Sequence, residues 1–418
     1  MKTILIFLVS LVILFTQVKD SLAIVNPAET RNNIFGIHIH DENDLEDAAK
    51  LVNSMGGDWG YVTLVIRKDD RNFQKWQNTF DKMRRLHLIP ILRIATRQQN
   101  GGWEKPSFGE IDGWASFLNE LNWVTKNRYV IIGNEPNHSK EWGNELNPEE
   151  YAQYLLQFSS KLKESSDEYF ILPAGLDASA PSDRLHMDEV QFIKRMLKKE
   201  PDVFEHIDGW NSHSYPNPNF SAPATKTGRI SIRTFEWELN LLQQLGVKNK
   251  LPVFITETGW IHDKNGENGN LTPSEISNRY ITAYGDVWLT DKRIIAVTPF
   301  ILNYQEPPFD VFSWKDSDGG FYDFYNQVKN ISKIEGTPQQ NCSLNVKVLL
   351  FPKVIKRGGL LYGLAYATNT GQSIWIKSSI ETIKDGSGTL DIIPIHPQTI
   401  EPQQSGLIYI SENIKPSD

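Results

Sequence analysis

Short apolar runs alternate with stretches of helical spacing between residues 34 and 302. Short apolar runs that end in polar or turn residues favour strands buried on both faces. The chain has eight such runs: Ile34–His40, Gly60–Arg67, Leu88–Ile94, Tyr129–Asn134, Phe170–Leu176, Ile207–Tyr215, Pro252–Glu257 and Ile294–Leu302. The pattern therefore predicts a series of buried strands with helices between them.

The stretch after the fourth run has the clearest helical pattern. Its apolar residues, which include Tyr151, Leu155 and Phe158, recur at the spacing of one helix face. Asn147 and Pro148 come just before it and suit the cap and first turn of a helix. Similar apolar stripes predict further helices around Phe73–Met83, Phe235–Leu242 and Tyr322–Val328.

The alternation of strands and helices predicts a (β/α)8 TIM barrel over residues 32–335. A doubly wound open sheet is the competing layout, but the first strand is not followed by the Gly-rich turn of dinucleotide-binding folds. Residues 338–418 have a different pattern, which predicts a small C-terminal β-sandwich domain. Its short runs are Leu344–Leu350, Leu360–Ala367, Ser373–Ser379 and Gly406–Ile410. We favour a packing role over sugar binding for this domain.

Residues 1–23 resemble an export signal. Lys2 gives a positive start, Ile4–Phe15 is almost entirely apolar, and Ser21 and Ala23 supply small residues for cleavage. The apolar run is short for a membrane span. We therefore expect a secreted or extracytoplasmic protein cut near Ala23. The alternative is that residues 4–18 stay uncleaved and anchor the protein in a membrane. We expect membrane contact only in that case.

Composition excludes several classes of function. The formal net charge is -8 and the chain has no block of Lys and Arg, so we expect no nucleic-acid partner. The single cysteine, Cys342, excludes an intramolecular disulfide and a Cys-rich metal site. No phosphate-binding loop or nucleophile elbow is visible. We expect a monomer that needs no cofactor or metal.

Polar residues gather where the predicted strands end. Glu135 ends the fourth strand and Glu257 ends the seventh, and in a closed eight-stranded barrel these ends face each other across the central pocket. Glycoside hydrolysis needs two carboxyl groups in this arrangement, one to protonate the leaving oxygen and one to attack the anomeric carbon. The polar strand ends read "GIHIH", "GNEPN", "NSHSYP" and "ITETGW" on strands one, four, six and seven.

The motifs "GNEPN" and "ITETGW" resemble those of the retaining (β/α)8 glycoside hydrolases that have their two catalytic glutamates on strands four and seven. The resemblance covers roughly residues 32–335. It implies that Glu135 is the acid/base, that Glu257 is the nucleophile and that Asn134 binds the sugar 2-hydroxyl group. It also implies an enzyme that cleaves O-glycosidic bonds of an oligo- or polysaccharide, and residues 1–23 add the expectation that this enzyme is exported. The family within the clan, the sugar, the linkage, and endo or exo action stay open.

Further residues are expected around this pair. His213 and Tyr215 lie two apart on strand six, so their side chains share a face. The resemblance implies that the tyrosine donates to the nucleophile and that the histidine binds either substrate or the neighbours of the nucleophile. Arg67 and Arg93 end strands two and three, and a cation near Glu257 would keep it ionised. The sequence leaves open which arginine this is.

Tryptophans in loops after the strands suit a saccharide cleft, because indole rings stack on the apolar faces of sugars. These loops contain Trp103, Trp142, Trp260 and Trp314. Of these, we expect Trp260 and Trp314 to contact substrate. The chain departs from the clan at strand eight, where a tryptophan is common and this sequence has Phe300.

His38 and His40 permit a different interpretation. Both would point inward from strand one. In barrel amidohydrolases, a His-x-His pair on strand one provides the first two ligands of the metal site. Strand five has no matching histidine and strand eight no matching aspartate, so we expect these histidines to contact sugar instead. A metal-dependent hydrolase built on His38 and His40 remains one alternative. A non-catalytic glycan-binding barrel is the other.

Overall fold

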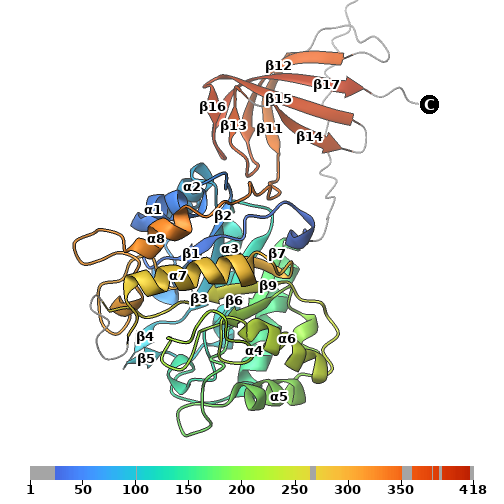
Figure 1. Ribbon diagram of the computed structural model, residues 1–418. Helices are drawn as coiled ribbons and strands as arrows, with labels where there is room; N and C mark the ends of the chain where they lie inside the picture. Colours follow the sequence, from blue (N-terminus) through green and yellow to red (C-terminus); the bar gives the residue numbers. More distant parts are fainter. Residues whose placement is uncertain are drawn as a thin grey trace, which may run out of the picture.

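The computed structural model describes residues 24–99, 101–263, 270–350, 360–378, 380–385 and 388–414 (Figure 1). The expected export signal, residues 1–23, lies outside the described residues. Within the described part, none of the helices has the length and apolar character needed to cross a bilayer.

Among the described residues, eight parallel strands form two sheets, and each of the eight predicted runs overlaps one of them. The first sheet has the order β1-β2-β3-β6-β7, and the second has the order β10-β9-β8. Single parallel bridges join the sheets on both sides, between Phe35 and Val297 and between Asp177 and His213. The strands are β1 (Gly36–His38), β2 (Gly60–Arg67), β3 (Leu88–Ala95), β6 (Arg128–Ile132), β7 (Tyr169–Pro173), β8 (Trp210–His213), β9 (Val253–Glu257) and β10 (Ile294–Val297).

A helix follows each of these strands along the chain. Local sequence explains their starts: the side chain of Asn147 accepts a hydrogen bond from the Glu150 backbone at 3.1 Å, and Pro148 opens the first turn. The predicted helices are confirmed as α2, α4, α6 and α8. The α-helices of the described residues are α1 (Leu45–Val52), α2 (Phe73–Arg85), α3 (Ile111–Glu120), α4 (Pro148–Ser165), α5 (Glu189–Lys199), α6 (Thr234–Gln244), α7 (Pro273–Ala283) and α8 (Asp323–Lys329).

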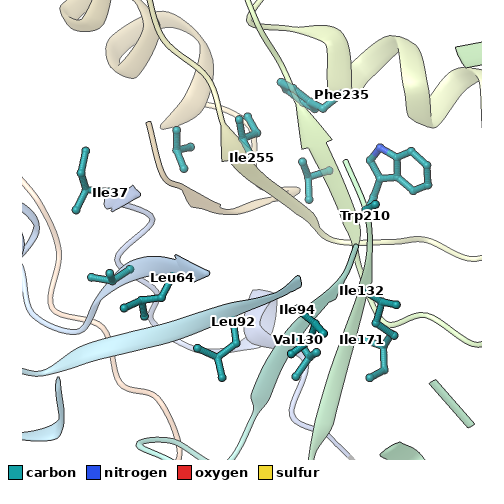
Figure 2. Close-up of a cluster of buried hydrophobic side chains, with 14 of the residues drawn as sticks. Ile37, Leu64, Leu92, Ile94, Val130, Ile132, Ile171, Trp210, Phe235 and Ile255 are labelled. Carbon is teal, nitrogen blue, oxygen red and sulfur yellow. The ribbon is translucent and has the colours of Figure 1, made fainter. Parts of the chain in front are cut away.

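Alternation along the strands divides the apolar side chains between two clusters. On β3, Ile89 and Ile91 belong to a cluster whose buried members all lie on strands of the two sheets. Leu92 and Ile94 point the other way, into the larger cluster shared with the helices, part of which Figure 2 shows. Burial on both faces explains why these strands read as continuous apolar runs.

The C-terminal part is an antiparallel β-structure. Its five-stranded sheet has the order β11-β12-β17-β15-β14, and β13 pairs with β16 beside it. Trp375, Ile392 and Ile408 belong to its small buried core. A sandwich remains our prediction for this domain. The strands are β11 (Leu344–Leu350), β12 (Leu360–Asn369), β13 (Trp375–Ile376), β14 (Glu381–Asp385), β15 (Gly388–His396), β16 (Thr399–Ile400) and β17 (Ser405–Ile414).

The C-terminal domain contacts the segment that leads into β6. Gln340 Nε2 donates to the Val124 carbonyl at 2.7 Å, and Gln372 Nε2 donates to the Thr125 carbonyl at 3.0 Å. These contacts precede the first residue of β6, whereas Glu135 follows its last residue. The domain therefore contacts the chain just before the N-terminal end of β6, the end opposite the one that Glu135 follows.

Candidate active site

The structure brings Glu135 and Glu257 together. Glu257 is the last residue of β9, and Glu135 follows β6 after a turn in which Gly133 has φ 91° and Glu135 itself has φ 31°. A positive φ is costly for a residue with a side chain, and such strain concentrates at functional sites. One side-chain ligand atom from each of Glu135, His213 and Glu257 lies within 4.8 Å of the others.

His213 lies between the two carboxyl groups at the end of β8. Its Nδ1 is hydrogen-bonded to Glu135 Oε1 at 2.8 Å and lies 3.7 Å from Glu257 Oε2. Gly175 makes room for the imidazole, because a side chain there would overlap the ring. Burial acts to lower the pKa of His213, but the charges of Glu257 and Glu135 outweigh it and raise this pKa overall.

Glu257 has partners that favour its ionised form. Arg93 Nη1 donates to Glu257 Oε1 at 2.7 Å, and the Tyr215 hydroxyl donates to Oε2 at 3.2 Å. Burial acts to raise the pKa of Glu257, but the charges of His213 and Arg93 lower it overall. Burial, and then the charge of Glu257, raises the pKa of Tyr215 well above its usual value, so this hydroxyl keeps its proton.

Asn134 connects this group to a further acid that the sequence pattern did not reveal. Its Oδ1 accepts from Arg93 Nη1 at 2.5 Å, and its Nδ2 donates to Glu141 Oε2 at 3.1 Å. Burial, and then the charge of Glu135, raises the pKa of Glu141 to about 7. Glu141 lies in a 3-10 turn, Ser139–Glu141, away from any strand end. Its one sequence signal is that it follows Glu135 in the same loop.

A hollow of about 520 Å³ lies beside Asn134, and this volume includes open solvent. It offers carboxyl groups and aromatic surface beside Asn134 and Arg93, a combination that suits a polar ligand with an apolar face. Its lining includes Arg93, Trp103, Glu110, Trp114, Asn134 and Glu141.

Of the two candidate arginines, the structure brings only Arg93 to Glu257. Arg93 is paired in register with Val65 and Ile131, whereas Arg67 is paired with Ala95, further along the strands. The Arg67 side chain is 46% exposed and forms an ion pair with Asp69 at 3.2 Å. The alternative in which Arg67 is the cation beside Glu257 is therefore wrong.

Trp260 and Trp314 do not present ring faces to an open cleft, so our expectation for them is also wrong. They are 2% and 1% exposed. Both rings pack against Tyr280, and Trp260 Nε1 donates to the Ala222 carbonyl at 2.8 Å. Both side chains are part of the core. Trp142 is buried as well, and both it and the partly exposed Trp103 are among the residues that line the hollow.

His38 and His40 do not converge on one site. His38 is buried with its ring edge against Phe300, and burial lowers its pKa to about 3. His40 is exposed and its ring packs against Tyr304. Among the described residues, neither belongs to the cluster of acids and histidine that is tight enough to hold a metal ion. This geometry removes the specific basis of the metal-dependent alternative.

No protein-family model matches the sequence, and no curated protein matches it. Solved structures with a similar chain path include an endo-β-1,4-glucanase from Xanthomonas axonopodis pv. citri, at 14% identity, covering 72% of this chain and 98% of that chain with a TM-score of 0.47. An endo-β-1,3-glucanase from Sorangium cellulosum is 11% identical, with coverages of 72% and 98% and a TM-score of 0.45. A β-mannanase from Thermomonospora fusca is 13% identical, with coverages of 74% and 94% and a TM-score of 0.43. Values this low assign neither a family nor a substrate to this chain.

Proposed function

We propose that the protein is a retaining glycoside hydrolase whose eight parallel strands close into a (β/α)8 barrel. The observation that carries this proposal is the approach of the carboxyl groups of Glu135 and Glu257 to within 4.8 Å. Retaining glycosidases hold their two carboxyl groups about 5 Å apart, whereas inverting enzymes need roughly 6.5 to 9.5 Å to admit a water molecule. The distance favours double displacement.

In the first step, a Glu257 carboxylate oxygen attacks the anomeric carbon and forms an ester bond to the sugar. The glycosidic carbon–oxygen bond breaks, and Glu135 transfers its proton to the leaving oxygen. Arg93 and Tyr215 support this assignment, because both donate to Glu257 and favour its ionised form.

In the second step, Glu135 removes a proton from a water molecule, whose oxygen attacks the anomeric carbon. The ester bond breaks and returns the carboxylate of Glu257. The net reaction of the two steps is the hydrolysis of one glycosidic bond by one water molecule. His213 contacts both carboxyl groups and helps to hold them in place through each step. We further propose that the enzyme is exported and that its substrate is an oligo- or polysaccharide.

The same three residues do not favour a metal centre. Arg93 Nη1 lies 2.7 Å from Glu257 Oε1. A cation bound at this carboxylate would be repelled by the guanidinium at short range, and repulsion between like charges is strong in a partly buried site. The geometry is therefore better suited to carboxyl chemistry.

The proposed function predicts that a covalent intermediate can be trapped on Glu257. Fluorine at sugar C2 slows both steps, while a dinitrophenolate leaving group restores the first, so the glycosyl-enzyme accumulates. A panel of 2,4-dinitrophenyl 2-deoxy-2-fluoro glycosides of mono- and disaccharides should include a member that releases about one equivalent of dinitrophenolate. Peptide mapping should find the added mass on Glu257.

The matched control is Glu257→Gln, which keeps the side-chain volume and should take no label. A label on another residue would contradict the assignment of the nucleophile. An active wild-type protein that hydrolyses glycosides with inversion of configuration would contradict the retaining mechanism.

A further inference from the structure

A series of hydrogen bonds links Glu141 to the proposed nucleophile. Glu141 Oε2 accepts from Asn134 Nδ2 at 3.1 Å, and Asn134 Oδ1 accepts from Arg93 Nη1 at 2.5 Å. The same guanidinium nitrogen donates to Glu257 Oε1 at 2.7 Å. Because arginine can only donate, the amide oxygen of Asn134 must face Arg93 and the amide nitrogen must face Glu141.

The nitrogen of the Asn134 amide has two hydrogens, and Glu141 accepts one of them. We propose that Glu141 is a positioning residue, which fixes the amide plane of Asn134 so that the second hydrogen is aimed at the 2-hydroxyl group of the reacting sugar. This inference rests on the proposed function, because it deepens the role given to Asn134.

The surroundings of Glu141 favour a fixed side chain. Its backbone N–H donates to the His138 carbonyl at 3.0 Å within the turn, and the residue lines the hollow beside Asn134. Charged neighbours come from several elements: Glu135 and His138 lie on the same loop, Arg93 on β3 and Glu257 on β9. A protonated carboxyl still offers one oxygen as an acceptor, so the bond to Asn134 persists in both protonation states.

The 2-hydroxyl contact can be isolated by comparing two substrates. The first is whichever 4-nitrophenyl glycoside the wild-type protein cleaves fastest among mono- and disaccharides. The second is the same compound without the 2-hydroxyl group on the reacting ring. The discrimination ratio is kcat/KM for the first divided by kcat/KM for the second. It should fall about tenfold in Glu141→Ala, the equivalent of one hydrogen bond, and a similar fall is expected in Asn134→Ala.

Two variants separate positioning from charge and from loop damage. Glu141→Gln still offers an oxygen to Asn134 Nδ2, so it should keep the wild-type discrimination ratio. Glu145→Ala is the matched control on the same loop, because this side chain is 55% exposed and forms an ion pair with Lys105. It should change neither the ratio nor the rate.

Each remaining outcome counts against a specific statement. If Glu141→Ala loses activity equally on both substrates and keeps the wild-type ratio, its role is structural and the inference is overturned. A wild-type protein that hydrolyses no glycoside overturns the proposed function and this inference with it. Normal wild-type hydrolysis with an unchanged ratio in Glu141→Ala overturns the inference alone.

Discussion

Arg93 is the side chain on which the proposed nucleophile most depends. Its guanidinium donates to Glu257 and also holds Asn134. Charge-assisted hydrogen bonds in a partly buried site are strong, so Arg93→Met should lower kcat/KM about 100-fold. Because the charge of Arg93 helps to lower the pKa of Glu257, its removal should also move the acid limb of the kcat/KM profile to higher pH.

Arg67→Met is the control for this substitution. Arg67 also ends a strand, but its side chain is exposed and pairs with Asp69 at 3.2 Å. When both proteins are measured on one substrate, the rates and the pH profile of Arg67→Met should be close to those of the wild type. Equal losses in both variants would show that the effect does not come from the contact with Glu257.

The sequence predicted which residues lie at the strand ends, but it did not always predict the direction in which their side chains point. Glu135, Glu257 and His213 follow from the polar strand ends, and the structure brings them together. Trp314 lies in a loop after the same series of strands, yet its ring turns into the core against Tyr280. Sequence position fixes the end of a strand, whereas packing in three dimensions decides which loop side chains face the cleft.

Two acidic side chains on consecutive helices are fully buried. Glu189 on α5 and Glu238 on α6 are both 0% exposed, and Trp210 on β8 donates to Glu238 Oε2 at 2.9 Å. Burial, and then the charge of Glu238, raises the pKa of Glu189 well above its usual value. Glu189 therefore keeps its proton in the folded state at a pH at which it has lost it in the unfolded state.

This difference should make Glu189→Gln more stable relative to the wild type as pH rises. The unfolded chain releases the Glu189 proton near its ordinary pKa, so the wild type loses folding free energy above that pH, by about 1.4 kcal/mol per pH unit for one proton. Glutamine cannot ionise and avoids this loss. Urea titrations at pH 5 and pH 8 should show a larger advantage for Glu189→Gln at pH 8.

The exposed Glu205→Gln should show no such trend and serves as the control. An equal stability difference at both pH values would contradict a buried, protonated Glu189. The sequence pattern did not predict that these two acids are buried. An acid in the first turn of a helix is normally explained by the helix dipole and solvent, and α5 does begin with Glu189.

Elements with strong local signals were predictable, and those without them were not. The α4 helix combined an apolar face with Asn147 and Pro148 at its start, and the structure confirms both. In the C-terminal domain, β14 and β15 were missed. Three of the five residues of β14 are charged, and Pro394 interrupts the pattern of β15, although both strands are paired in the five-stranded sheet. Pairing with neighbours stabilises these strands where local propensity does not.

The two ends of the parallel strands are used differently: one end carries the candidate site and the other contacts the C-terminal domain. The candidate site follows the last residues of β6 and β9, whereas the C-terminal domain contacts residues that precede β6. At the domain contact, Gln372 is 5% exposed, donates to the Thr125 carbonyl and accepts from the Asn341 backbone at 2.9 Å. A substitution here should affect folding without affecting chemistry.

Gln372→Ala should therefore destabilise the protein by about 1 to 3 kcal/mol, because it leaves a buried carbonyl and a backbone N–H without partners. Thermal unfolding and steady-state kinetics on the same preparation would measure both effects, and kcat and KM should match the wild type. Gln398→Ala changes an exposed glutamine of the same domain and should alter neither quantity. A fall in kcat for Gln372→Ala below its unfolding temperature would mean that the domain influences the site across the length of β6. In that case, stability and catalysis would not be separable along these strands.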